Sequence, residues 1–485
     1  MLPDMRICSA RKWALSCLGL CCLLFSGSSI ADTPLEYAVK VPADLSMLTV
    51  TTCFKNDPPQ RLVSENRNAQ HLIRNIRLIH GGQSMPLALS GSVIDLEDAQ
   101  QGDCLRYEAT LYDRTARAWF GTRLSHHAQV LVGLQDWLWV PAWFDDSGHI
   151  IQLNFILPNG MQVSSPGHRT VHDGGVSYRL LKRPPDWEAS IALGRFTEQS
   201  LPIAGATVNI AILNAAGSMN TSGLLEWIRK NLEALSKAYG TLPVQDLQVL
   251  VVPVGQGREP VPWGQLMRGG GDAVHLYIDQ TRPERQFMND WVLIHELSHL
   301  FHPWIYARDR WLYEGIATYY QNVLRAREGL ISPDAAWTEL HQGFERGLKG
   351  TPENETLVEV SENMLRNRRF MRVYWSGAAF CLKADYELRK QSHDRQSLDT
   401  ALKKFDECCL PATGLWTGRE FLDKLDELTH TTVFRDLYDK YAMSTTFPKL
   451  DDVYRSLGLI KHGDAITMDN QATDASICKA IMQKR

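Results

Sequence analysis

The spacing of apolar residues changes near residue 214, and this change limits the folds that the chain can adopt. Between residues 35 and 213, apolar positions alternate with polar ones or form short runs, and Gly, Pro, Asn and Asp separate the segments. This pattern predicts strands, in an all-β sandwich or barrel. The predicted strands cover residues 37–41, 47–54, 105–112, 150–157 and 208–213.

After residue 214 the apolar period becomes helical. Residues 221–239 place apolar side chains on one face, and Gly240 ends this predicted helix. Strands are predicted at 247–254 and 274–278, and helices at 285–304, 311–328 and in several segments between 333 and 459. The fold class is therefore α+β: an N-terminal all-β domain, followed by a domain with a small mixed sheet and a helical lobe.

Residues 1–31 have the pattern of a signal peptide. Basic residues precede an apolar run over residues 13–25, and small residues then end in Ser29-Ile30-Ala31. The run is short for a transmembrane span and is followed by a cleavage pattern. We expect an exported chain, periplasmic or secreted, that is cut after Ala31 and has no membrane segment afterwards.

The remaining cysteines suggest disulfides, because export leads to an oxidising compartment. Cys53 and Cys104 lie in the same β-rich stretch and are expected to pair, while Cys408, Cys409 and Cys478 could supply another bridge. Cys381 lies in a helical pattern, where a buried free thiol is the alternative. The formal net charge is −4 and no basic block occurs, so a nucleic acid partner is not expected.

Three tryptophans, Trp137, Trp139 and Trp143, cluster near the middle of the β-rich segment. They could form a surface on which a ligand stacks. An aromatic core is the interpretation that we favour, because large aromatic side chains dominate cores.

The segment His295-Glu296-Leu297-Ser298-His299 lies within a predicted helix. Helical residues four apart share a face, so both imidazoles can bind one cation at about 2.0–2.1 Å. Glu296 is rotated by roughly 100° from His295, so it borders the metal without ligating it. From there its carboxylate can act as general base on the attacking water and pass the proton to the leaving amine. The alternative is two partly buried histidines on an ordinary helix.

A third ligand is available in the sequence Trp-Leu-Tyr-Glu-Gly-Ile-Ala-Thr-Tyr over residues 311–319. Two histidines and a glutamate are an established set for catalytic zinc. Glu314 follows His299 after fourteen residues, enough for a turn and a returning helix, and it lies in an otherwise apolar run. We therefore expect one zinc ion per chain, held by His295, His299 and Glu314.

His302 is a rival ligand, one turn beyond His299. Three histidines along one straight helix cannot all reach one ion, because the third lies about 5 Å further along the axis. We expect His302 to lie behind the ligands or at the surface.

Together, these two motifs resemble the gluzincins, the thermolysin-like zinc peptidases that share the aminopeptidase N fold. The segment Tyr374-Trp375-Ser376-Gly377 is similar to their Tyr-x-x-Gly helix start, whose tyrosine hydroxyl stabilises the oxyanion. The resemblance implies this role for Tyr374, with a core tyrosine as the alternative. It extends to the glycyl aminopeptidases, which place a β-rich domain before the catalytic domain.

The chain departs from that family in several places. The insert between His299 and Glu314 is short, Gln321 stands where relatives often carry a glutamate, and too few residues follow Leu459 for a PDZ domain. Residues 269–277 resemble the strand that borders the substrate cleft, with a glycine loop joining two strands as the alternative. Asp272 could replace the missing glutamate that binds a substrate amine.

These interpretations divide the chain into a signal peptide (1–31), a β-rich domain (32–215), a gluzincin-like zinc peptidase domain (216–460) and a C-terminal tail (461–485). We expect an exported zinc metallopeptidase for peptide or protein substrates, aminopeptidase-like or a short-peptide endopeptidase. A non-catalytic exported binding module with a structural or vestigial metal site is the alternative. Hydrolysis of a non-peptide bond, such as an epoxide, is a related alternative.

Overall fold

The computed structural model describes residues 34–483 except 65, 67, 112–128, 143–149, 174, 181–188, 216–218, 256 and 413. The predicted signal peptide and Trp143 lie outside these residues. Pro34–Arg485 form one compact unit. None of the helices in the described ranges is both long and apolar enough to cross a membrane.

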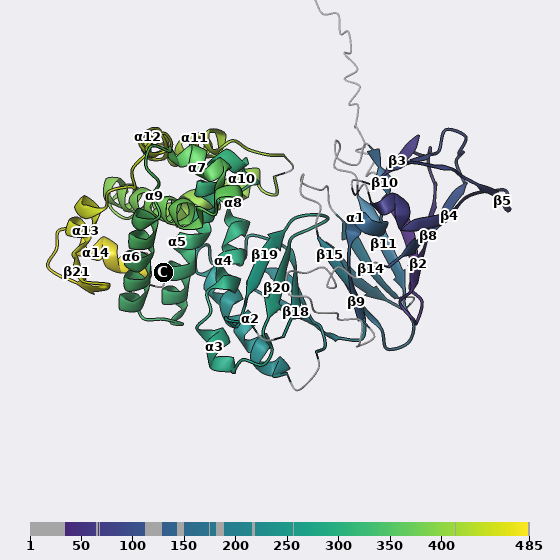
Figure 1. Ribbon diagram of the computed structural model, residues 1–485, viewed down its shortest axis with the longest axis horizontal. Helices are drawn as coiled ribbons and strands as arrows, with labels where there is room; N and C mark the ends of the chain where they lie inside the picture. Colours follow the sequence, from purple (N-terminus) through teal and green to yellow (C-terminus); the bar gives the residue numbers. More distant parts are fainter. Residues whose placement is uncertain are drawn as a thin grey trace, which may run out of the picture. The chain divides into compact units, whose positions relative to one another are not determined.

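The N-terminal region is β-rich, as expected (Figure 1). Its described strands form sheets of eight, four and three strands. The eight-stranded sheet has the order β13 (His168–His172), β14 (Gly175–Leu180), β11 (Ile151–Ile156), β1 (Leu35–Lys40), β2 (Met47–Cys53), β8 (Cys104–Thr110), β4 (Ile73–His80), β5 (Gln83–Pro86). The four-stranded sheet has the order β10 (Val140–Pro141), β3 (Arg61–Val63), β7 (Val93–Asp95), β6 (Leu89–Ser90). The three-stranded sheet has the order β12 (Gln162–Ser164), β15 (Ser190–Gly194), β9 (Gln129–Gly133).

Trp137 and Trp139 belong to the core of this region. Both side chains are almost completely buried, at 1% and 0% exposure, with Trp137 in the short helix α1 (Leu134–Trp137). The hydroxyl of Tyr107 donates to the Trp137 carbonyl at 3.0 Å, and that of Tyr37 donates to the Trp139 carbonyl at 2.8 Å. For these two residues the aromatic-core interpretation is confirmed and a ligand-stacking surface is excluded.

A further, five-stranded sheet carries the helical lobe. Its order is β16 (Thr197–Ile203), β17 (Ala206–Ile212), β18 (Asp246–Pro253), β20 (Ala273–Ile278), β19 (Trp263–Met267). The three central strands are parallel, whereas β16 and β19 are antiparallel edge strands. Strand β18 is buried on both faces, because Val249 and Val251 pack under the helices and Leu250 and Val252 face Leu131 of β9.

The predicted domain boundary at residue 215 does not coincide with the boundary between the sheets. Strand β17 pairs with β16 and, in parallel, with β18. Residues 197–212 therefore belong to the five-stranded sheet of the second half and not to the sheets of the β-rich region. Strand alternation alone does not tell which sheet a strand joins, because that choice depends on pairing with residues far along the chain.

The described helices of the second half pack on one face of this sheet and on one another (Figure 1). Their bounds are α2 (Thr221–Ser236), α3 (Glu284–Met288), α4 (Val292–Ser298), α5 (Arg310–Glu328), α6 (Pro333–Lys349), α7 (Leu357–Glu362), α8 (Met364–Asn367), α9 (Phe370–Ser392), α10 (Leu398–Cys409), α11 (Gly418–Thr429), α12 (Val433–Tyr441), α13 (Asp451–Leu457) and α14 (Ala475–Met482). Short 3-10 helices cover Ala69–His71, His299–Phe301 and Ala307–Asp309, and strands β21 (Leu459–His462) and β22 (Ala465–Met468) form a hairpin.

The predicted C-terminal tail is ordered in its described part. Ile477, Ile481 and Met482 of α14 are buried in the helical core, and Arg327 of α5 donates to the Ile481 carbonyl at 2.9 Å. Residues 475–482 have apolar side chains at helical spacing, which explains why this segment packs onto the lobe.

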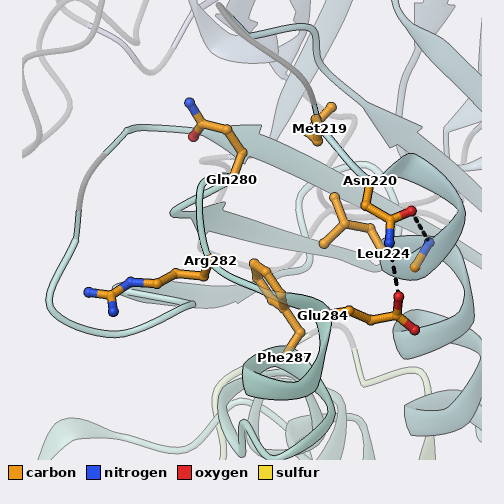
Figure 2. Close-up of a pocket in the computed structure, with 8 residues that line it drawn as sticks. Met219, Asn220, Leu224, Gln280, Arg282, Glu284 and Phe287 are labelled. Carbon is orange, nitrogen blue, oxygen red and sulfur yellow. Dashed lines mark hydrogen bonds between the residues drawn. The ribbon is translucent and has the colours of Figure 1, made fainter.

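Asn220 begins helix α2 (Figure 2). Its carboxamide oxygen accepts from the Gly223 N–H at 3.0 Å, which is the usual N-cap bond, and its amide donates to Glu284 at 2.9 Å. The small pocket drawn there is lined by residues of α2, of α3 and of the segment before α3. It contains none of the residues predicted to bind metal or to act in catalysis.

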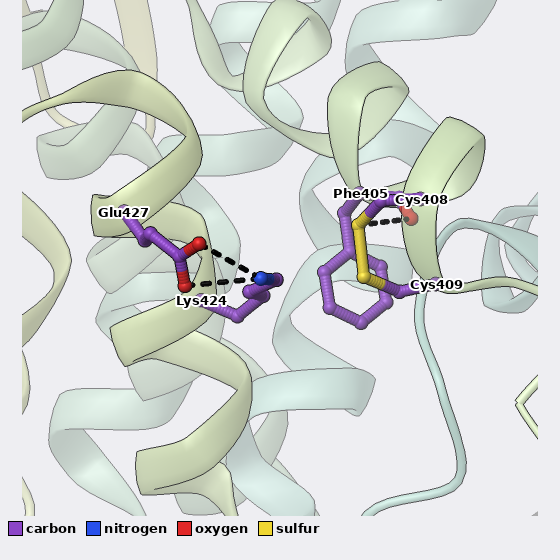
Figure 3. The surroundings of a disulfide bond; sticks show 5 residues. All are labelled: Phe405, Cys408, Cys409, Lys424 and Glu427. Atoms are coloured by element: carbon purple, nitrogen blue, oxygen red, sulfur yellow. Dashed lines mark hydrogen bonds and ion pairs between the residues drawn. A yellow bond between two sulfur atoms is a disulfide. The ribbon is translucent and has the colours of Figure 1, made fainter. Parts of the chain in front are cut away.

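The cysteines pair partly as expected. Cys53 and Cys104 form a disulfide between facing positions of β2 and β8, which confirms the prediction. A second disulfide joins the neighbours Cys408 and Cys409 at the end of α10, beside Phe405 (Figure 3). Cys381 and Cys478 are buried free thiols.

Candidate metal centre

The predicted helix over residues 285–304 is broken into shorter elements. Asp290 accepts the N–H of Val292 at 2.8 Å, a local turn that precedes helix α4, whose N-cap residue is Trp291. At the other end, His302 is extended with φ −140° and ψ 160°, since the residue before a proline avoids the helical region. His299 therefore begins a 3-10 turn directly after α4.

The three predicted ligands meet in spite of this break. The Nε2 atoms of His295 and His299 lie 3.4 and 3.8 Å from Oε2 of Glu314, which comes from helix α5. All three potential donor atoms lie within 4.8 Å of one another. The three side chains are buried. Helix α5 lies beside α4, as we predicted from the number of residues between His299 and Glu314.

This arrangement fits a tetrahedral zinc ion. Two donors at about 2.0–2.1 Å from one tetrahedral ion lie about 3.3 Å apart, close to the observed spacings from Glu314 to both histidines. In addition, Oε2 of Glu314 is buried and accepts no hydrogen bond from the described residues. A buried carboxylate oxygen that lacks a hydrogen bond is costly unless a cation compensates for it.

His295 is oriented by Gln321, about two turns further along α5 than Glu314. Nδ1 of His295 lies 2.8 Å from Oε1 of Gln321, which can only accept, so Nδ1 carries the proton and Nε2 is left with a lone pair. Burial lowers the pKa of His295, but the nearby carboxylates of Glu314 and Glu296 outweigh it and raise the pKa.

His302 lies behind His299 and is not a third ligand from the same helix. Its Nε2 lies 3.0 Å from Nδ1 of His299, and its own Nδ1 lies 2.7 Å from the Pro303 carbonyl. Burial, together with the charges of neighbouring groups, lowers the pKa of His299 and His302 well below the usual value. The expectation that His302 lies behind the ligands matches its position.

Glu296 is a residue of α4, and its side chain lies beside the edge strand β19. One of its carboxylate oxygens accepts the Leu266 N–H at 3.0 Å, and a Cβ atom on Gly264 would come within 2.8 Å of its Cγ. Burial, followed by the charge of Glu314, raises the pKa of Glu296 to about 7, although His295 and the Leu266 bond oppose the rise. Such a carboxylate can both accept and return a proton near neutral pH.

Tyr374 comes from helix α9. Its ring stacks on His295 with the centroids 5.8 Å apart and the planes at 18°. Burial, followed by the charges of Glu314 and Glu296, raises the pKa of Tyr374 well above the usual value, so the hydroxyl keeps its proton. It is thus a neutral hydrogen-bond donor beside the ligand set.

The sequence analysis missed the residues that surround His302. Arg268 donates to the carbonyls of His299 and His302, the latter at 3.0 Å. The Tyr313 ring stacks on His302 at 5.6 Å and on Trp304 at 6.4 Å. Tyr313 directly precedes the proposed ligand Glu314, so the sequence could have identified it as a neighbour of the site. The position of Arg268 depends on strand pairing, which no local pattern reveals.

The glycine-rich segment before β20 is a loop that joins two strands. Strand β20 lies inside the sheet and β19 forms its edge, so the prediction that residues 269–277 border the cleft is wrong. The loop packs against the β-rich region, because a Cβ atom on Gly271 would lie 2.5 Å from the Gly167 nitrogen. Asp272 is partly buried at the end of this loop, where desolvation raises its pKa and the Arg268 charge opposes the rise.

Comparisons with known proteins agree with this architecture. Residues 294–378 match the model of the M61 glycyl aminopeptidase family, a stretch that contains the metal centre and Tyr374. No curated protein matches the chain.

Two solved structures are similar in fold. An aminopeptidase N family protein from Idiomarina loihiensis aligns with a TM-score of 0.64 and 15% identity, over 88% of this chain and 78% of that chain. An M1 zinc metallopeptidase from Deinococcus radiodurans aligns with a TM-score of 0.50 and 16% identity, over 86% of this chain and 94% of that chain. The protein thus has the α+β fold of the aminopeptidase N-like gluzincins, and its residues 294–378 are similar to the M61 glycyl aminopeptidases.

Proposed function

We propose that the protein is an exported zinc-dependent peptidase, aminopeptidase-like in its action, with one zinc ion per chain. The observation that carries the proposal is the meeting of His295, His299 and Glu314 around one point, with a buried Glu314 oxygen that lacks a hydrogen bond. The M61 match over the same residues and the peptidase fold support hydrolysis of peptide bonds.

His295 and His299 would hold the ion through their Nε2 atoms, and Glu314 through Oε2. A zinc ion bound by three protein ligands polarises a carbonyl and lowers the pKa of water at its fourth position to about 7. The surrounding residues exclude bulk water, because all three ligand side chains are buried.

Glu296 acts as the general base in this proposal. Its carboxylate takes a proton from the water that attacks the peptide carbonyl, and returns this proton to the leaving amine as the C–N bond breaks. The hydrogen bond from the Leu266 N–H fixes one carboxylate oxygen, which leaves the other free for the reacting water.

Tyr374 stabilises the developing oxyanion. Its protonated hydroxyl can donate a hydrogen bond to the negative oxygen that forms when water adds to the carbonyl. The stacking of Tyr374 on His295 keeps the phenol next to the ligand set, so this donor is oriented before the substrate arrives.

The experiment uses the full chain and a mixed peptide library. Zinc content is measured by mass spectrometry, and cleavage is compared for wild type, Glu296→Gln and the exposed control Glu353→Gln. We expect about one zinc per chain in all three proteins. Cleavage by Glu296→Gln should be at least about 100-fold slower, while the control keeps the wild-type rate. Stoichiometric zinc without cleavage of any peptide, or an active Glu296→Gln variant, would overturn the proposal.

A further inference from the structure

His302 folds back onto the ligand His299 because the chain leaves the helix at this residue. The following Pro303 excludes the helical conformation, and the extended backbone of His302 turns its ring behind that of His299. The two ring centroids lie 5.2 Å apart with the planes at 89°, so the ring edge of one histidine faces the other.

The Pro303 carbonyl determines where His302 carries its proton. A carbonyl oxygen only accepts, so Nδ1 of His302, 2.7 Å away, must be the protonated nitrogen. In a neutral imidazole the other nitrogen is then a bare acceptor. Nε2 of His302 therefore accepts from Nδ1 of His299 at 3.0 Å, and His299 is left with an unprotonated Nε2 on the side of Glu314.

Two neighbours keep this arrangement in place. The Arg268 guanidinium donates to the carbonyls of both histidines and so ties the backbone of His299 to that of His302. The Tyr313 ring stacks on His302 at 27° and limits rotation of the imidazole.

We propose that His302 is a positioning residue that sets the tautomer of His299, so that Nε2 of His299 is free to bind the metal. The relay runs from the Pro303 carbonyl through His302 to His299. The partner of a ligating histidine is usually a carboxylate, a backbone carbonyl or water, and here a neutral imidazole takes that place. The inference rests on the proposed zinc site. The tautomer of His299 that it predicts can also be observed in the metal-free protein.

Zinc affinity of His302 variants tests the relay. His302→Phe keeps a ring against Tyr313 but removes the hydrogen-bond acceptor. In His302→Gln, the carboxamide oxygen can reach the position of the lost Nε2 and accept from His299. Competition with a chromophoric chelator should give a zinc Kd about 10–100-fold higher for His302→Phe, with recovery towards the wild-type value in His302→Gln. The control is His341→Phe, a buried histidine of α6 whose partners are Gly463 and Tyr454.

Readouts on the metal-free proteins separate positioning from folding. Thermal unfolding should show that His302→Phe is still folded, and 15N spectra of labelled histidines should show His299 protonated at Nδ1 in the wild type and a mixture of tautomers in His302→Phe. Equal zinc affinity and an unchanged His299 tautomer in His302→Phe would overturn the relay and leave the zinc site standing. Failure of the wild type to bind zinc would instead overturn the proposed function, and the relay with it.

Discussion

Gly315 and Gly377 bring helices α5 and α9 into backbone contact. A Cβ atom on Gly315 would lie 2.3 Å from Cα of Gly377, and one on Gly377 would lie 1.8 Å from the Trp311 carbonyl oxygen. Glu314 precedes the first glycine, and Tyr374 lies one turn before the second. The close crossing of the two helices therefore places the proposed third ligand and the proposed oxyanion donor beside each other.

Substitution of either glycine should separate these helices. For Gly377→Ala we expect a loss of stability of at least about 1–3 kcal/mol, because the backbone must move to admit the methyl group. Activity should fall further than stability does, since Glu314 and Tyr374 move apart. Denaturant unfolding and peptidase rates check this against Gly414→Ala, where a Cβ atom would meet nothing within 4 Å. Wild-type stability in Gly377→Ala would contradict the close contact.

Gln321 holds the proposed ligand His295 through a neutral hydrogen-bond acceptor. In Gln321→Glu a carboxylate would accept the Nδ1 proton of His295 and make the ring a stronger ligand, so zinc affinity should rise. Gln321→Leu removes the acceptor, and affinity should fall about 10–100-fold. Chelator competition measures both, with Gln342→Glu on α6 as the control, since that side chain contacts the Asp464 carbonyl. Equal affinities in all these variants would show that Gln321 does not orient His295.

The clustering of the three proposed ligands could be predicted because it follows local rules. His295 and His299 are four residues apart, and Glu314 is an acid in an apolar helical run, so helical spacing and composition sufficed to select them. The end of the helix at His302 was also encoded locally, in Pro303, but the wider helical prediction over residues 285–304 ignored this signal.

Features that depend on strand pairing could not be predicted. The Leu266 N–H that binds Glu296 faces the metal centre only because β19 is the edge of its sheet, and this follows from pairing with β20. The same holds for β16 and β17, whose alternation predicted strands but did not reveal their sheet. Both the edge position of β19 and the sheet that β16 and β17 join depend on strand pairing, which contacts between residues distant in sequence determine.

The two disulfides should differ strongly in their effect on stability. Cys53 and Cys104 close a loop with a sequence separation of 51 residues, which corresponds to about 4 kcal/mol of loop entropy in the unfolded chain. Cys408 and Cys409 are neighbours and close almost no loop. Replacement of both cysteines of a pair by alanine should therefore lower the unfolding free energy by about 4 kcal/mol for the first pair and little for the second. Urea unfolding of the two double variants checks this, and equal losses would count against the loop-entropy explanation.

Asp385 anchors a buried network between α5, α9 and α10. Its carboxylate accepts from Arg389 at 2.9 Å, from the Tyr319 hydroxyl at 2.8 Å and from the Leu398 N–H at 2.9 Å. Burial alone would raise the pKa of Asp385, but the charge of Arg389 and these hydrogen bonds outweigh it and lower the pKa below the usual value. An acid with a lowered pKa in the folded state stabilises the fold above its unfolded pKa of about 3.9, and this contribution is lost as the pH falls through the folded value.

Asp385→Asn should thus cost roughly 1–3 kcal/mol at pH 7, because the buried Arg389 loses one charged partner while Asp394 and Asp399 remain beside it. The difference from wild type should shrink below about pH 4, where the carboxyl of the unfolded wild type binds a proton first, and the carboxyl of the folded protein follows at its lower pKa. Unfolding by urea at several pH values measures the difference, with the exposed Asp98→Asn as control. If the difference stayed constant down to pH 3, the carboxylate charge would not be the source of the stability, and the hydrogen bonds to Asp385 alone would have to account for it.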